Sequence, residues 1–363
     1  MSVYIILFFV IHKVVFSDSY NLSSVDETYI KGYQAYSKEH WEECTEWFQE
    51  SLYLFKLYKT IIINCRIKCK NQYQKPVLND LHDDLKTYEV LFNRGHCLYK
   101  CQEKEFKNNN LNSDISTTIL HNMQNRKPYQ YLHVCYYQTH DVQSAASAAA
   151  TFLALQPDDI EMKQHLQTYL NKPSVKREEV VDLEKEHYAI LFDRALNFYK
   201  QSIWDKTIDN LEEAILEYIF WEENCRVECE HQSKREEEQS ELIIVMSNYI
   251  VSYLECRQSC QNNLKLIEYD SGVHFLADML NYLQICYYHL NDFKKAAKST
   301  ATYLALMPDD DDMLHNKEIY STLVQSEDFI ENADIINYLK RDNQEKELLK
   351  LFDQGYNHYY NGS

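Results

Sequence analysis

Four pairs of cysteines, each pair with three residues between its members, are the residues of this chain best placed to do chemistry. A step of four residues is about one turn of an α-helix, so each pair would present both sulfurs on one helix face. The pairs are Cys65/Cys69, Cys97/Cys101, Cys225/Cys229 and Cys256/Cys260. The first two recur as the second two at offsets of 160 and 159 residues. Such regular spacing indicates that the cysteines were duplicated together with a larger segment.

Disulfides between neighbouring helices suit these pairs better than bonds within a pair. Within one helix turn the two Cβ vectors run parallel, which strains the required dihedral angle. Between antiparallel helices, the first cysteine of one pair meets the last of the other. This predicts Cys65 with Cys101, Cys69 with Cys97, Cys225 with Cys260, and Cys229 with Cys256. The alternatives are a tetrahedral four-thiolate zinc site, although CxxC is the commoner zinc spacing, and free thiols.

Three further cysteines lie outside the pairs. They are Cys44, Cys135 and Cys286. Cys44 occupies a place where two helices are expected to cross, and the other two stand among tyrosines and aliphatic residues. We expect all three to be free, small buried side chains. An intermolecular disulfide is the alternative.

A second internal repeat predicts the architecture. At an offset of 151 residues, 17 of the 32 positions from Tyr131 to Met162 are identical. Each copy fits the 34-residue tetratricopeptide pattern of two helices closed by a proline. The matching positions are Leu132, Tyr136, Ala145, Phe152 and Pro157 in one copy, and Leu283, Tyr287, Ala296, Tyr303 and Pro308 in the other. The predicted fold is therefore all-α, a tetratricopeptide-like solenoid in two duplicated halves stapled by the CxxxC disulfides.

Looser hairpin units lead each half, and their second helices should continue without a break to Cys69 and Cys229. We divide the chain into a signal peptide (1–17), a first half (18–172), a second half (173–340), and a C-terminal capping helix and tail (341–363). Each half should contain a hairpin, an extended helix ending in CxxxC, a linker, another helix ending in CxxxC, and a final hairpin. Stacked repeats of this kind offer extended binding surfaces.

The N-terminal segment predicts entry into the secretory pathway. An apolar run over residues 2–11 is followed by Val15, Phe16 and Ser17, which offer a small-residue cleavage site. This indicates a signal peptide, with an uncleaved anchor or a buried helix as alternatives. No later segment approaches membrane-spanning length, so we expect a luminal or secreted chain in which disulfides are permitted. Asn21 begins a glycosylation sequon.

The amino-acid composition limits which fold classes and which kinds of partner are plausible. Only five glycines and five prolines occur in 363 residues, which favours helix over a turn-rich β fold. The formal charge of −19 argues against nucleic acid or an anionic membrane as the partner. Sequence motifs for phosphate binding, serine hydrolysis and zinc proteolysis are missing, so we expect no catalytic, metal or cofactor site. His82, Asp83 and Asp84 have the H-x-D form of iron ligands, but their place at the start of a helix predicts a helix N-terminus instead.

The chain resembles the leprecan family over most of its length, about residues 25–352. The segments that carry the resemblance are residues 39–41 (EHW), 94–101 (RGHCLYKC), 128–132 (PYQYL), 254–260 (LECRQSC), 282–288 (YLQICYY) and 344–348 (QEKEL). Four CxxxC pairs in this order are a specific feature of that family. Members with a C-terminal dioxygenase domain hydroxylate prolines of procollagen.

The resemblance implies a function and partners. The chain ends where the catalytic domain would begin in those members, so we expect it to belong to the non-catalytic branch. That branch binds a prolyl 3-hydroxylase and a cyclophilin-type prolyl isomerase in the endoplasmic reticulum. The assembly modifies and chaperones unfolded procollagen. The alternatives are the N-terminal part of a prolyl 3-hydroxylase that has lost its dioxygenase domain, and a general luminal helical-repeat adaptor.

Overall fold

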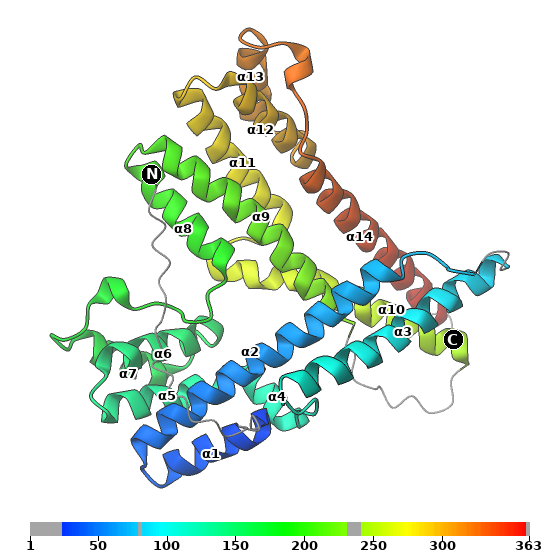
Figure 1. The fold of residues 1–363 in the computed structure, drawn as a ribbon. Coiled ribbons are helices and arrows are strands. Elements are labelled where there is room, and N and C mark those ends of the chain that lie inside the picture. Colours follow the sequence, from blue (N-terminus) through cyan, green and yellow to red (C-terminus); the bar gives the residue numbers. More distant parts are fainter. Residues whose placement is uncertain (1–23, 79–81, 231–240, 361–363) are drawn as a thin grey trace.

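The computed structural model describes residues 24–78, 82–230 and 241–360. Within these ranges the chain folds into fourteen α-helices and three short 3₁₀ helices, and contains no strand (Figure 1). The prediction of an all-α repeat fold is confirmed. The predicted signal peptide (1–17) and Asn21 lie outside the described residues.

The first half contains seven α-helices. They are α1 (Val25–Ser37), α2 (Trp41–Gln72), α3 (Asp83–Asn108), α4 (Thr117–Gln124), α5 (Lys127–Gln138), α6 (Val142–Leu155) and α7 (Ile160–Leu170). The long second helix continues past Cys69, as the absence of glycine and proline predicts. We expected α3 to end at its CxxxC pair, but it extends to Asn108 because nothing in residues 102–108 interrupts a helix.

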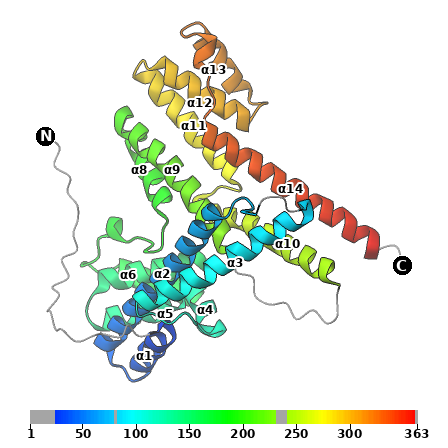
Figure 2. The same ribbon diagram turned by 45° about the vertical axis from the view of Figure 1, so that its right-hand side comes forward.

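The second half repeats this order, except that it has no separate counterpart of α4 and adds a last helix, α14. Its helices are η1 (Arg177–Glu179), α8 (His187–Lys200), α9 (Trp204–Glu228), α10 (Leu242–Ser259), η2 (Cys260–Ile267), α11 (Gly272–His289), α12 (Phe293–Leu306), α13 (Asp311–Ser321), η3 (Ser326–Asp328) and α14 (Ala333–Tyr360). The last helix, α14, starts ahead of the boundary that we placed at residue 341 and lies along α10 (Figure 2).

The duplication extends to the helix caps. Asp141 and Asp292 accept hydrogen bonds from the amides of Ser144 (3.0 Å) and Lys295 (3.2 Å) and so begin α6 and α12. Asp159 and Asp310 begin α7 and α13 in the same way, each accepting from a methionine amide at 2.8 Å. Side-chain caps of this kind satisfy amides that have no partner inside the helix. The two final hairpins therefore begin their helices by the same device.

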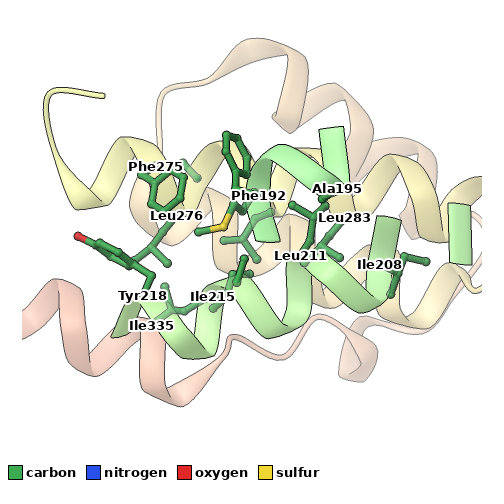
Figure 3. Close-up of a cluster of buried hydrophobic side chains, with 14 of the residues drawn as sticks. Phe192, Ala195, Ile208, Leu211, Ile215, Tyr218, Phe275, Leu276, Leu283 and Ile335 are labelled. Atoms are coloured by element: carbon green, nitrogen blue, oxygen red, sulfur yellow. The ribbon is translucent and has the colours of Figure 1, made fainter. Parts of the chain in front are cut away.

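Each half has its own hydrophobic core. The first-half core lies between α1, α2, α5 and α6, and includes Phe48, Leu132 and Phe152. The second-half core lies between α8, α9 and α11 and also receives Ile335 from α14 (Figure 3). Tyr338 of α14 belongs to the same core. Alanines at the helix crossings, such as Ala145 and Ala296, are fully buried. Small residues at these places let the paired helices approach closely.

Gly272, at the start of α11, is required by the close approach of α14. A Cβ atom at this position would clash with the hydroxyl groups of both Tyr338 and Tyr218. The two tyrosines meet over the glycine, with their hydroxyl oxygens 3.2 Å apart and buried. The α14 helix is therefore fitted into the second-half core and packs there through its first turns.

Candidate functional site

Two disulfide ladders, one in each half, hold the long helices together. In the first half they join Cys65 to Cys101 and Cys69 to Cys97, both with Cα atoms 5.7 Å apart. In the second half they join Cys225 to Cys260 and Cys229 to Cys256, with Cα separations of 5.9 and 5.7 Å. These are the pairings that antiparallel helices predict, and the separations are ordinary for disulfides. Each ladder fixes a helix against the extension of a hairpin: α3 against α2, and α10 against α9.

A fifth disulfide corrects one of our expectations. Cys44 and Cys135, which we expected to be free, are joined to each other with Cα atoms 6.1 Å apart. The reason is that α2 packs directly on α5, and both cysteines lie fully buried at that contact. Their proximity was not visible in the sequence, because 91 residues separate them. The tetratricopeptide alignment offered part of a signal, since it placed Cys44 where two helices cross.

Cys286 is the free cysteine of the described chain, as we expected. It is buried in α11 at the position that corresponds to Cys135 under the 151-residue offset. Burial raises the pKa of its thiol to about 12. A thiol with so high a pKa stays protonated and is a poor nucleophile or metal ligand at neutral pH.

The two halves meet where the C-terminal part of α9 crosses α2 (Figure 1). Arg66 of α2 is buried there and donates hydrogen bonds to the carbonyl oxygens of Val227 (3.0 Å) and Glu228 (2.8 Å). Those carbonyls stand at the C-terminal end of α9, where a helix leaves them without partners inside the helix and where positive charge is favoured. The arginine thereby caps a helix that belongs to the other half.

Ion pairs surround this junction, and each has its base in the first half and its acid in the second. Lys59 pairs with Glu228 at 3.2 Å, Lys70 with Glu223 at 3.3 Å, and Arg94 of α3 with Glu230. The two lysine pairs are open to solvent and contribute little to stability individually, but the shared polarity of all three pairs favours one way for the two halves to meet. The junction is therefore specified by charge.

A buried set of charges, which we call the α14 charge cluster, joins α14 to α9 and α10. It consists of Glu222, Arg226, Arg257, Arg341, Asp342 and Glu345. Arg226 contacts both Glu222 and Glu345, and Arg341 approaches Glu222 to 2.6 Å. Burial raises the pKa of Glu222, and the two arginines oppose that shift. The cluster holds α14 in one register, because a shifted helix would leave buried charges unpaired.

The aromatic residues are used mainly for packing. We expected most of the 30 tyrosines to pack at helical spacing and some to line a surface. Several, such as Tyr129, Tyr218 and Tyr338, are buried. The exposed tyrosines of the described chain are Tyr33, Tyr53, Tyr88, Tyr99, Tyr249 and Tyr288, and they lie on five different helices. Of these, Tyr88 and Tyr99 share one helix, α3.

A shallow cleft opens at the tips of the first two hairpins. It has a volume of about 500 Å³ and is lined by His40, Trp41, Glu42, Glu43, Gln138, Thr139 and His140. It contains no cysteine or serine nucleophile. Across residues 24–78, 82–230 and 241–360, no three His, Cys, Asp or Glu side chains come together in a way that could hold a metal ion. The triplet that begins at His82 stands at the N-terminal end of α3, with Asp83 as its first residue.

The described part of the chain contains no helix with the length and apolar character needed to cross a membrane. Its long helices instead carry frequent charged residues, as in α2 and α9. Among the helix surfaces left uncovered by the two cores, α3 carries three exposed aromatic side chains, Tyr88, Phe92 and Tyr99.

Known proteins share this repeat region. Residues 24–324 match the leprecan family TPR-like repeat region. The chain is 30% identical to human cartilage-associated protein over 304 residues, which cover 82% of this chain and 74% of that protein. It is 28% identical to chicken prolyl 3-hydroxylase 1 over 343 residues, covering 89% of this chain and 46% of the enzyme. It is 26% identical to rat endoplasmic reticulum protein SC65 over 348 residues, covering 90% of this chain and 76% of that protein.

Proposed function

Because the chain belongs to the leprecan family, we propose that it is a non-catalytic subunit supporting collagen prolyl 3-hydroxylation and chaperoning in the endoplasmic reticulum. The observation that carries the proposal is how much of each relative's length the alignment covers. The alignment covers 74% of cartilage-associated protein but only 46% of prolyl 3-hydroxylase 1. What this chain shares with the enzyme is thus the helical repeat region. Repeat arrays supply binding surface to other proteins.

The proposed partners are those that the family resemblance implies: a prolyl 3-hydroxylase, a cyclophilin-type prolyl isomerase, and unfolded procollagen as the shared substrate.

The architecture suits a subunit that binds other proteins. Five disulfides and the α14 charge cluster keep the long helices in a fixed arrangement, so a bound partner meets a preformed surface. A surface fixed in advance loses less conformational entropy on binding. The relative named for the endoplasmic reticulum supports the proposed location.

The test compares hydroxylation with and without this chain. Purified chain, a full-length prolyl 3-hydroxylase and both together are incubated with unfolded procollagen, iron and 2-oxoglutarate, and 3-hydroxyproline is quantified by mass spectrometry. We expect no product from the chain alone, and more product or a longer-lived enzyme when it accompanies the hydroxylase. Turnover by the isolated chain would overturn the non-catalytic role. A chain that neither binds nor affects any hydroxylase would overturn the subunit role.

A second candidate is the N-terminal part of a prolyl 3-hydroxylase. The alignment with prolyl 3-hydroxylase 1, which covers 89% of this chain, favours it. The discriminating measurement is the transcript. An open reading frame that continues past Ser363 into a β-rich sequence with an H-x-D and a later histidine would establish this candidate in place of the first. The third alternative is a general luminal adaptor. It would be supported if the chain bound neither hydroxylase nor procollagen but did bind another luminal protein.

A further inference from the structure

The outer face of α3 carries an uncovered apolar row that we call the α3 stripe. Its members follow one another at steps of three and four residues, which places them on one side of the helix. They are Leu85, Tyr88, Phe92, Gly95 and Tyr99. The four large side chains are 45%, 53%, 73% and 67% exposed, in that order. The disulfide cysteines of α3 point to the opposite side, toward α2. Figure 2 shows α3 along the front of the molecule.

The second half shows what covers such a face. Under the 159-residue offset that relates the α3 cysteines to Cys256 and Cys260, the counterparts of the last four stripe positions are Ser247, Val251, Leu254 and Gln258 in α10. Leu254 is only 8% exposed, whereas a Cβ atom added to its counterpart Gly95 would meet no other atom within 4 Å. Gln258 donates to Asp342 (3.2 Å) and Glu345 (3.0 Å) of α14. In the second half this face is therefore packed under a long helix.

The corresponding face of the first half lacks such a helix within the described residues. Among the side chains described for α14, which run to Leu351, none forms a hydrogen bond or ion pair with α3, and the polar contacts of α9 with the first half involve the C-terminal part of α9, around Arg66. Exposed aromatic side chains such as Phe92 and Tyr99 gain free energy when they leave water. Both halves therefore present a face that can bind a helix. Within the described residues, only the face on α10 is covered by a helix of the chain itself.

We infer that the α3 stripe docks an amphipathic helix of a partner protein, in the position that α14 occupies on α10. The inference deepens the proposed function and rests on it for the identity of the partner, the hydroxylase subunit. From Leu85 to Tyr99 the stripe is about 21 Å long at 1.5 Å per residue, so the incoming helix needs roughly four turns. Gly95 forms a gap between Phe92 and Tyr99 into which a large side chain of that helix would insert.

Charge beside the stripe specifies the incoming helix further. Lys100 and Lys107 are exposed on the flank of α3, about a quarter turn around the helix from Tyr99, while the exposed Glu103 continues the line of the stripe, in a chain whose formal charge is −19. A helix with apolar residues at the same three-and-four spacing and with acidic residues beside them would satisfy both features. A second copy of this chain fits less well, because it would bring together two molecules of the same strong negative charge.

The test uses the whole chain and the full-length prolyl 3-hydroxylase, coexpressed and purified through a tag on the hydroxylase. Phe92→Asp with Tyr99→Asp should weaken the dissociation constant at least about tenfold, because buried aromatic anchors carry much of an interface. Leu216→Asp with Phe220→Asp is the matched control, since these residues of α9 are similarly exposed, at 62% and 59%. The control variant should bind as the unaltered chain does.

Gly95→Arg separates binding from folding. The position is exposed and open, and a residue with a side chain favours helix over glycine, so the variant should unfold at the same or a higher temperature. It should nevertheless lose binding, because the new side chain fills the gap. Lys100→Glu with Lys107→Glu should also weaken binding and reduce its dependence on salt.

Each result decides between outcomes. An unaltered chain that fails to bind hydroxylase overturns the proposed function together with this inference. Binding by the unaltered chain and equal binding by the Phe92/Tyr99 and Gly95 variants overturns this inference alone. Variants that dissociate a homodimer, without a change in hydroxylase binding, would assign the stripe to a second copy. Variants that lose only their affinity for an unfolded procollagen peptide would assign the stripe to an extended substrate. Either of these last two results would overturn the proposal that the stripe docks a helix of the hydroxylase.

Discussion

Arg66 and Arg226 occupy equivalent positions in the two halves, 160 residues apart, and bind different kinds of acceptor. Arg226 is surrounded by carboxylates of its own half and anchors α14. Arg66 has no such acids within the described residues of its own half and donates instead to two backbone carbonyls at the end of α9. After the duplication, one copy of the position came to close its own half, and the other came to join the halves. A buried arginine at this position therefore stabilises the packing of its own half in one copy, and the contact between the two halves in the other.

Two further positions sharpen the comparison. His133 and Tyr169 form a buried polar pair in the first half, with 3.0 Å between Nδ1 and the hydroxyl oxygen. Under the 151-residue offset the second half has Gln284 and Tyr320, which are also hydrogen-bonded. Only the first of these pairs contains an imidazole, a group whose ordinary pKa is close to neutral pH. The Cys135 position likewise bears a disulfide in the first half and the free thiol of Cys286 in the second.

The largest expected effect comes from removing the charge of Arg226. Arg226→Met should lower the free energy of unfolding by about 3–5 kcal/mol, because Glu222 and Glu345 lose the buried cation that they share and keep only the more exposed Arg341 and Arg257. Arg66→Met should cost less, about 1–3 kcal/mol, since it leaves neutral carbonyls rather than charges without a partner. Urea unfolding followed by circular dichroism measures both. Equal losses would remove the distinction that we draw between the two arginines.

The disulfide between Cys44 and Cys135 is expected to have the next largest effect. Replacing it with Cys44→Thr and Cys135→Ala should cost about 2–4 kcal/mol, because the unfolded chain regains the freedom that the bond removes. Thr207 occupies the tetratricopeptide place of Cys44 in the second half, so threonine suits the site. Cys286→Ala is the control and should cost less, roughly 1 kcal/mol, since no bond is lost. Thermal unfolding under non-reducing conditions compares the variants, and a control as damaging as the double replacement would argue against the bond.

Acid should weaken the first half through His133. Burial, and then the nearby His165, lower the pKa of His133 from 6.5 to about 4. Because the unfolded state binds this proton more readily, the stabilisation is complete above pH 6.5 and is lost as the pH falls toward 4. A shift of this size corresponds to about 3 kcal/mol at most. His133→Gln, which copies Gln284, should remove that part of the pH dependence between about pH 7 and pH 4. An unchanged profile in the variant would contradict the assignment.

The smallest effect on stability, and the simplest to measure, concerns the thiol of Cys286. Because burial raises its pKa to about 12, it should react with iodoacetamide only after unfolding, giving one labelled cysteine in guanidinium chloride and almost none in the native chain. Thr207→Cys should complete the comparison by forming with Cys286 the bond that the first half already has. Mass spectrometry would then detect no free thiol. Persistent labelling in this variant would show that the two hairpins cross differently.

Features with local periodicity could be predicted from the sequence, and features that depend on tertiary contacts could not. The two disulfide ladders were predictable because CxxxC places both sulfurs on one helix face and antiparallel packing leaves one pairing order. The bond between Cys44 and Cys135 was missed because it depends on how α2 crosses α5. The α14 charge cluster was missed because Glu222 and Arg226, four residues apart, have the spacing of an ordinary solvent-exposed ion pair. The α3 stripe has helical periodicity, but only its exposure distinguishes it from a core face.

The hydrogen bonds from Arg66 to the end of α9 also set an order of events at the ribosome. The acceptors, on Val227 and Glu228, lie 161 and 162 residues farther along the chain than the arginine. At about 5–20 residues per second, the first half waits roughly 8–32 seconds during synthesis before its buried arginine can find its acceptors. For that interval a nascent first half presents an unsatisfied guanidinium group and an open face of α2. Luminal folding factors would therefore meet a nascent chain whose Arg66 and α2 face are exposed, although both are covered in the folded protein.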